Sequence, residues 1–205
     1  MRQSSTSPYE EAIGHRMEQL HPRLRAYFSS IPVGKVGVGE GVFERFGTRY
    51  RWLTPLLAPL RSRGVIVPGW HRNVPFRVEN RTVSGTARAR RTLRFPSGPW
   101  AMVDAVRATR RGRVVDQLGS PKTIAASFDV DIVDGELRLT SRAVGVKLGR
   151  ARLRLPQWAA PRVRLTERYD DTTEKQRVHL TIDVPGLGRV YEYEGSFTYR
   201  IEEET

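Results

Sequence analysis

The feature that most constrains the fold is an alternation of apolar and polar residues, with a period of two, between Val74 and Ile201. Successive side chains of a β-strand point to opposite faces of the sheet, so this period predicts strands with one buried and one wet face. In the clearest stretch, 124–132, every even position is apolar, and the stretch leads into Asp134-Gly135, a strong hairpin signal. This part of the chain is therefore predicted to be a sheet.

About nine segments carry the strand pattern. They are 74–81, 87–95, 100–108, 113–118, 124–132, 137–143 with its continuation 146–155, 163–169, 178–184 and 190–201. The turns between them are short, and a parallel connection needs a dozen or more residues, so neighbouring strands are predicted to be antiparallel. The predicted fold is α+β and mainly antiparallel β: a large curved sheet or partly closed barrel of about nine to eleven strands, with N-terminal helices packed against it.

The residues before the sheet favour helices. We expect residues 1–7 to be a flexible N-terminus and 8–205 a single domain, in which 8–62 is mainly helical with one glycine-rich strand and 74–201 is the antiparallel sheet. After Ser7, which is placed to cap a first turn, apolar residues recur every three or four positions, which is the period of a helix. The N-terminal helices are expected to fill or cover the barrel.

Local signals add detail to the helical part. Pro22 is expected to break the first helix, because proline lacks the backbone N–H that a helix interior needs. The glycines of 34–43 alternate and no Gly-Lys-Ser/Thr follows, so this stretch is predicted to be a glycine-kinked strand rather than a phosphate-binding loop. Residues 50–62 are predicted to form a short helix, capped by Thr54 and kept short by Pro59.

Composition excludes several kinds of site. The chain has no cysteine, which excludes disulfides, Cys–zinc sites, iron–sulfur clusters and a cysteine nucleophile. The four histidines lack the spacing of metal ligands, so no metal and no cofactor is predicted. No apolar run approaches the roughly 18 residues of a membrane span, and the start lacks the apolar segment of a secretory signal. We therefore expect no transmembrane segment and a cytoplasmic location.

The chain carries a formal net charge of +13, and only four of its 35 basic residues are lysine. An excess of arginine favours a phosphate-bearing partner, because the planar guanidinium binds phosphate with two hydrogen bonds, but it also follows from codon bias in a GC-rich genome. Many arginines recur at every second position and are expected on the wet face of the sheet. They are Arg88, Arg90, Arg94, Arg150, Arg152, Arg154, Arg162, Arg164 and Arg168.

Several turns, in this order, resemble one bacterial protein family. They are Val115-Asp-Gln-Leu-Gly119, Asp134-Gly-Glu-Leu-Arg-Leu139, Leu153-Arg-Leu-Pro-Gln-Trp-Ala-Ala-Pro-Arg162 and Pro185-Gly-Leu-Gly-Arg-Val-Tyr-Glu-Tyr-Glu-Gly-Ser-Phe197. More loosely, 20–24 and 41–45 are similar too. The family is the domain-of-unknown-function family numbered 4166. Its members occur alone or behind a nucleotide-binding oxidoreductase domain, so the resemblance implies an oxidoreductase partner and a substrate-holding role, and it carries over no catalytic residue.

Four charged residues have the parity of the apolar face. They are Arg91, Asp104, Asp116 and Glu167. A charge that leaves water for an apolar interior must be paired or must shift its pKa. These residues are therefore expected either to form a polar anchor at the bottom of a pocket or to be a buried ion pair with no ligand. A bulge in the strand, which reverses parity, would instead place Arg91 in solvent beside Arg90.

The predicted ligand-binding residues are Arg91, Trp100, Asp104, Phe128, Glu167, Tyr191, Tyr193 and Phe197. In this hypothesis Arg91 holds a carboxylate or phosphate head group, and the aromatic residues surround the apolar body of a small amphipathic or lipid-like molecule. One alternative is an enzyme that uses Asp104 or Glu167 as a desolvated general base. Another is a binder of nucleic acid or anionic membrane through the arginine-rich face; the absence of interleaved aromatic residues disfavours nucleic acid.

Overall fold

The computed structural model describes residues 6–148, 151–156 and 158–204. Its helical segments are α1 (Pro8–Ile13), the 3-10 segment η1 (Gly14–Gln19), α2 (Pro22–Phe28), the 3-10 segment η2 (Arg51–Leu53) and α3 (Thr54–Ser62). Its strands are β1 (Lys35–Gly47), β2 (Trp70–Val83), β3 (Thr86–Phe95), β4 (Gly98–Thr109), β5 (Arg113–Leu118), β6 (Ile124–Val133), β7 (Glu136–Leu148), β8 (Ala151–Arg154), β9 (Arg162–Asp170), β10 (Lys175–Val184) and β11 (Gly188–Glu203).

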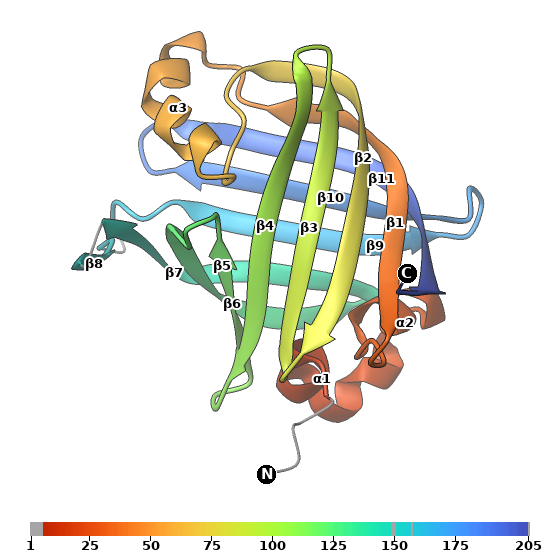
Figure 1. Cartoon of the computed structure of the whole chain (residues 1–205). Coiled ribbons are helices and arrows are strands. Elements are labelled where there is room, and N and C mark those ends of the chain that lie inside the picture. The colour runs from red at the N-terminus through yellow and green to blue at the C-terminus, as the bar shows by residue number, and fades with distance from the viewer. Residues whose placement is uncertain (1–5, 149–150, 157, 205) are drawn as a thin grey trace.

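Within these residues the strands form one antiparallel sheet in the order β6-β5-β4-β3-β2-β1-β11-β10-β9-β7-β8, and β6 also pairs with β7. This last pairing closes ten strands into a ring, while β8 pairs with β7 outside it (Figure 1). The predicted curved antiparallel sheet is confirmed as a closed barrel. No helix in the described part of the chain is long and apolar enough to cross a bilayer.

The β6–β7 hairpin turns where the sequence predicts it. Asp134 and Gly135 have φ angles of 52° and 79°, the left-handed backbone that a two-residue type I′ turn requires. A register shift between Ser127 and Phe128 lets β7 gain one residue, which reverses its parity. Ala143, predicted on the apolar face, therefore lies opposite Ser127, and Val144 is buried instead. The predicted continuation 146–155 is also corrected, because β7 and β8 form a hairpin there.

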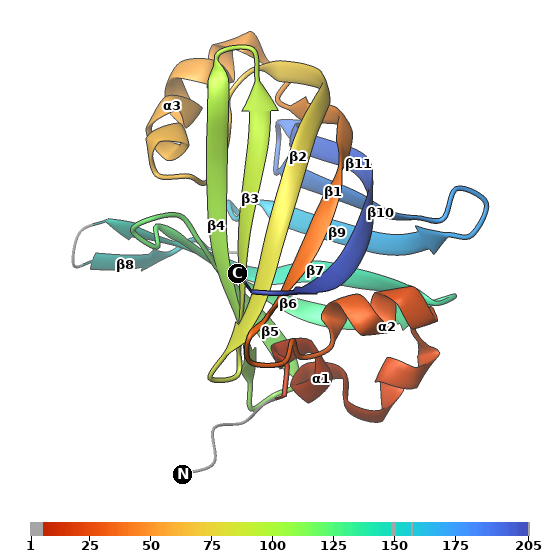
Figure 2. The same ribbon diagram turned by 45° about the vertical axis from the view of Figure 1, so that its right-hand side comes forward.

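Helices occupy both ends of the barrel: α1 and α2 lie at one end and α3 at the other (Figures 1 and 2). The apolar side of the first group, Ile13, Met17, Leu20, Leu24 and Phe28, joins the inward residues of β4 to β7 in one buried cluster. Ser7 caps α1 as predicted, and its hydroxyl donates a hydrogen bond to the carbonyl oxygen of Phe28. The N-terminal helices thus plug the barrel.

The observed helix ends show the outcome of the three predictions made for Pro22, Thr54 and Pro59. Pro22 does break the first helix, and it becomes the first residue of α2. Thr54 is not the cap of α3 but its first residue, because Leu53 already has helical dihedral angles from the preceding 3-10 turn. Pro59 lies inside α3, which continues to Ser62. Loss of one backbone N–H is tolerated in this exposed helix.

The predicted glycine-rich strand is β1, and its glycines make room for aromatic side chains. A Cβ atom on Gly39 would lie 2.6 Å from a methyl group of Val78, and one on Gly41 would lie 2.0 Å from the backbone oxygen of Ser196. Both would also meet Phe197, which comes from the neighbouring strand β11. β1 and β11 can therefore approach closely in the barrel wall because glycine has no side chain at these positions.

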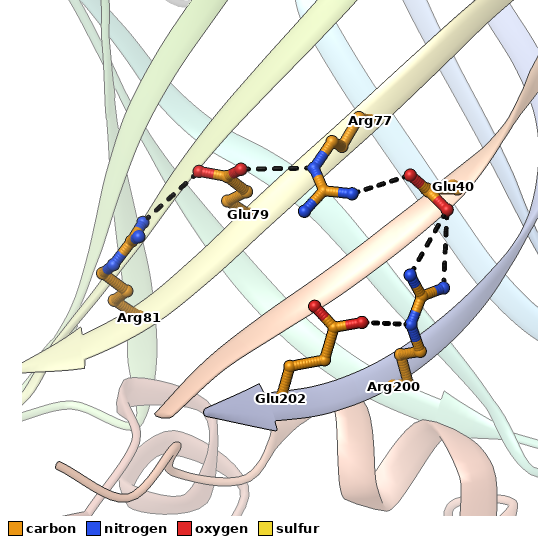
Figure 3. A network of polar contacts seen from close by, with 6 residues as sticks. All are labelled: Glu40, Arg77, Glu79, Arg81, Arg200 and Glu202. Atoms are coloured by element: carbon orange, nitrogen blue, oxygen red, sulfur yellow. Dashed lines mark hydrogen bonds and ion pairs between the residues drawn. The ribbon is translucent and has the colours of Figure 1, made fainter. Parts of the chain in front are cut away.

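Ion pairs cover the outer face of β2, β1 and β11. Figure 3 shows the network, which consists of Glu40, Arg77, Glu79, Arg81, Arg200 and Glu202. Arg77 lies 2.7 Å from Glu40 and 3.2 Å from Glu79. Val38 on β1 lies opposite Glu79 on one neighbouring strand and opposite Arg200 on the other. It has the outward parity of Glu40 and is nevertheless fully buried. The long side chains thus exclude water from the outer surface as well as pairing their charges.

The arginines predicted on the wet face are exposed wherever the structure describes them. They are Arg88, Arg90, Arg94, Arg162, Arg164 and Arg168. Arg150 and the side chains of Arg152 and Arg154 lie outside the described residues.

Gly41→Ala should lower the free energy of unfolding by about 2 kcal/mol or more, because the new methyl group meets backbone atoms that cannot rotate away. Val42→Ala, at the next and outward-facing position, should cost less than about 1 kcal/mol. Urea denaturation of both variants measures the difference. Equal stabilities would contradict the close packing of β1 against β11.

Candidate functional site

The barrel encloses a cavity of about 350 Å³ between the two groups of helices. Its walls are mostly aliphatic: side chains such as Val144, Leu165 and Ile182 line it from the strands, and Leu57 and Leu60 line it from α3. Pockets that bind small molecules commonly have volumes of about 300 to 1,000 Å³ and apolar walls with a few convergent polar groups. The cavity matches this description if its polar groups converge.

The four charged residues with apolar parity do converge on the cavity. Arg91 on β3, Asp104 on β4, Asp116 on β5 and Glu167 on β9 all line it, and we call them the polar cluster. The register of β3 with β2 and β4 is continuous, so no bulge turns Arg91 into solvent. The hypothesis that Arg91 joins Arg90 outside the barrel is therefore wrong.

Arg91 and Asp104 form an ion pair. A guanidinium nitrogen of Arg91 donates a hydrogen bond to a carboxylate oxygen of Asp104, and the side chains are 22% and 5% exposed. The pairing follows from the sheet, because Asp104 lies opposite Ala89, which is two residues before Arg91 on the same face. Burial raises the pKa of Asp104, whereas the contact with Arg91 favours its ionised form.

Asp116 is the least satisfied member of the polar cluster. Its Oδ1 atom is buried and has no hydrogen-bond partner among the described residues. Burial and the nearby Asp104 carboxylate raise the pKa of Asp116 to about 8, although Arg91 and the backbone N–H of Gln117 favour the ionised form. Asp116 is therefore mostly protonated at neutral pH.

Glu167 closes the polar cluster from the opposite wall. Its carboxylate accepts a hydrogen bond from the side-chain amide of Gln176, and both residues are buried. Burial raises the pKa of Glu167 to about 7, against the lowering effects of the Gln176 hydrogen bond and of Arg91. Glu167 is thus near half protonation at neutral pH.

The charge balance of the cavity bears on the role expected of Arg91. Among the described residues that line the cavity, three carboxyl groups face one guanidinium. Since Asp104 already pairs with Arg91, an incoming carboxylate or phosphate would meet more negative than positive charge. Arg91 is thus already paired in this structure, its expected role as the anchor of an anionic head group stays a prediction, and the protonated acids beside it offer hydrogen bonds.

The polar cluster lies toward the N-terminal helices. Arg91, Asp104 and Glu167 also line a second, smaller pocket of about 50 Å³, together with Tyr27 and Phe28 of α2. At the other end of the large cavity lie the leucines of α3 and Leu187, from the turn between β10 and β11. The cavity therefore has a polar end and an apolar end, as an amphipathic molecule does.

The structure brings six of the eight predicted site residues to the cavity: Arg91, Asp104, Phe128, Glu167, Tyr191 and Tyr193. Trp100 and Phe197 are not among the residues that line it. The indole nitrogen of Trp100 donates a hydrogen bond to the carbonyl oxygen of Arg61, 3.0 Å away, and so ties β4 to the end of α3. Phe197 packs among Tyr27, Phe76 and the glycines of β1.

Sequence reasoning missed the contribution of α3. Leu53, Leu57 and Leu60 line the cavity, and their spacing of four and three residues places them on one face of the helix. This spacing was a usable signal, because a short helix with an apolar face must cover another apolar surface. Tyr9 of α1 also lines the cavity, and its burial raises the pKa of its phenol, which stays protonated.

The raised pKa values of Asp116 and Glu167 make stability depend on pH. In the unfolded chain both groups titrate near about 4, whereas in the folded protein they do so at about 8 and about 7. The folded state then holds more protons in between, so these two groups make stability fall as the pH rises from about 5 to 8. Asp116→Asn should reduce this fall, measured by urea denaturation at several pH values. The exposed Glu44→Gln is the control, and an unchanged slope in Asp116→Asn would refute the assignment.

Removal of one partner of the buried ion pair should be costly. Arg91→Met leaves Asp104 without its counter-charge and should lower the free energy of unfolding by about 3 kcal/mol, whereas Arg90→Met on the outer face should change it by less than about 0.5 kcal/mol. Adding Asp104→Asn to Arg91→Met should restore part of the loss. Additive effects of the two substitutions would argue against direct pairing.

The comparisons with known proteins give the family and nothing finer. No curated protein matches the chain. The family model described as "Domain of unknown function (DUF4166)" matches residues 20–197 of the 205 residues, a span that contains β1 to β10, most of β11 and the whole polar cluster. The resemblance noted in the sequence is thereby confirmed, and the chain belongs to the DUF4166 family.

Proposed function

We propose that this protein binds a small amphipathic, lipid-like molecule in the barrel cavity. Its polar end would lie at the polar cluster and its apolar body would extend toward α3. One observation supports this proposal above the others: a cavity with mostly apolar walls has its charged groups gathered toward the end at the N-terminal helices.

The energetics of the cavity favour such a ligand. Each methylene group that leaves water for apolar walls contributes about 0.8 kcal/mol to binding. The unpartnered oxygen of Asp116 is a buried polar atom that costs about 1 to 3 kcal/mol, which a ligand hydrogen bond would offset. A hydroxyl or amine both fits the protonated acids and avoids repulsion from the carboxylates. The proposed ligand therefore carries a neutral or cationic polar group rather than a carboxylate or phosphate.

A holding role fits the oxidoreductase partner that the family resemblance implies. A barrel that shields an apolar molecule from water would present it to a partner with a nucleotide cofactor, and no redox group would then be needed in the barrel itself. We include such a partner in the proposal.

Fluorescence of the neutral probe N-phenylnaphthylamine, which increases in apolar surroundings, tests the binding site. Ala126 is buried and lines the cavity, so Ala126→Phe should weaken probe binding at least about tenfold by filling the space. Ser127→Phe places the same ring on the opposite face of β6 and should leave binding unchanged. Decanol and decylamine should displace the probe better than decanoate does.

Two results would overturn the proposal. One is equal probe binding by both phenylalanine variants, with circular dichroism showing that both are folded. The other is a purified protein that shows no probe binding. Stronger displacement by decanoate would instead overturn the proposed polarity of the ligand. Native mass spectrometry of the purified protein, followed by solvent extraction, identifies any molecule that it retains.

A second candidate function is acid–base catalysis in the same cavity. The observation that favours it is the buried Asp116, with a pKa of about 8 and an oxygen that has no hydrogen-bond partner in the described part of the chain. Asp116 suits this role better than Asp104, which contacts Arg91, or Glu167, which contacts Gln176. Conversion of an extracted ligand by the wild type and not by Asp116→Asn would support catalysis; an unchanged ligand would refute it.

A further inference from the structure

One side of the molecule combines exposed apolar side chains with unpaired positive charge. Figure 1 places α3, β8 and the turn between β10 and β11 on this side, at the left of the view. We call it the mouth face, because α3 and that turn also line the apolar end of the cavity. Its exposed apolar residues are Trp52, Leu56, Leu153, Trp158 and Leu187, and its basic residues are Arg51, Arg61, Arg63, Lys122 and Lys147.

Backbone contacts join the parts of the mouth face into one surface. The amide of Ser120 donates a hydrogen bond to the carbonyl oxygen of Arg63, which follows α3, at 2.9 Å. The amide of Lys147 on β7 donates one to Thr123, at 2.7 Å. Residues 119–123 therefore connect α3 with the β7–β8 hairpin. A surface groove lined by Lys122, Lys147 and Leu153 lies along this connection.

The charges of the mouth face are not compensated. Among the described residues, no carboxylate lies within ion-pair distance of Arg51, Arg61, Arg63 or Lys147. Lys122 contacts only the amide oxygen of Gln117, at 2.9 Å. The network on the outer face of β2, β1 and β11 differs, because Arg77, Arg81 and Arg200 are paired with glutamates (Figure 3). The mouth face therefore attracts anions that the ion-paired face does not.

The apolar side chains of the mouth face are large, and most of their surface is exposed to water. The side chains of Leu56 and Trp158 are 66% and 80% exposed. The continuous segment of η2 and α3 is apolar on two sides, since Leu53 and Leu57 line the cavity while Trp52 and Leu56 are exposed. Covering the outer side of such a segment removes more apolar surface from water and is therefore favourable. Tryptophan and leucine flanked by arginine and lysine are the residues that enter the interface of an anionic bilayer.

We propose that the mouth face docks on an anionic lipid bilayer. α3 would lie in the headgroup region with Trp52 and Leu56 inserted, and the arginines beside it would pair with lipid phosphates. An amphipathic molecule would then pass between the bilayer and the cavity without entering water. Docking itself does not depend on what the cavity holds, so it is tested separately. Exposed leucines favour a bilayer over a nucleic acid, which offers no hydrocarbon phase.

Flotation with vesicles tests the docking. The wild type should bind vesicles of equal parts phosphatidylcholine and phosphatidylglycerol at least about tenfold more tightly than vesicles of phosphatidylcholine alone. The triple variant Arg51→Gln, Arg61→Gln, Arg63→Gln should lose most of this preference, and Leu56→Ser with Trp158→Ser should weaken binding to both. The matched control changes Arg88, Arg90 and Arg94 to Gln, which removes the same charge from the outer face of β3.

The outcome separates the alternatives. Binding that the control triple variant weakens as much as the α3 triple variant would overturn the proposal in favour of non-specific charge attraction. Tighter binding to a single-stranded oligonucleotide than to the mixed vesicles would overturn it in favour of nucleic acid. Failure of the wild type to bind either kind of vesicle would also overturn the proposal. Unchanged circular dichroism spectra of all variants show that they remain folded, whether or not the cavity binds the probe.

Discussion

The structure depends on the pairing of β6 with β7, which closes the sheet into a ring. Without it the sheet has two free edges and an apolar face open to water. Closure also determines how much room is inside. A barrel of about eight strands is just filled by its own side chains, whereas a ring of ten is wider. Helices at both ends take up part of this extra width, and a cavity remains between them.

Much of the fold could be predicted because β-strand periodicity is a direct consequence of backbone geometry. The strands, their antiparallel order and the Asp134-Gly135 turn all follow from local patterns. The bulge in β7 opposite Ser127 could not be predicted. An extra residue in a strand reverses the alternation of apolar and polar residues after it, but the sequence does not show at which residue the reversal begins. The start of α3 was misplaced by one residue, since a 3-10 turn supplies its first helical residue and Thr54 is not needed as a cap.

The candidate site was predicted in part for a related reason. Parity tells which face of the sheet a residue occupies, and it correctly placed Arg91, Asp104 and Glu167 inside. It does not tell how far along the barrel axis the residue lies. Phe197 faces inward at a level where Tyr27 of α2 occupies the interior, so its ring serves the packing rather than the cavity. The ion pair between Arg91 and Asp104 also needed the register, which the sequence does not contain.

The pairing of β1 with β11 has a consequence for how the protein is made. Lys35 lies opposite Glu203, so β1, which pairs with β2 on one side, has its second partner in a strand far away along the chain. All the strands from β1 to β11 must be made before the wall can close, and contacts so distant in sequence slow folding. The hairpins between β1 and β11 form earlier, and their apolar faces stay exposed to water until the barrel closes. During synthesis this chain therefore has a long interval in which a chaperone would be useful.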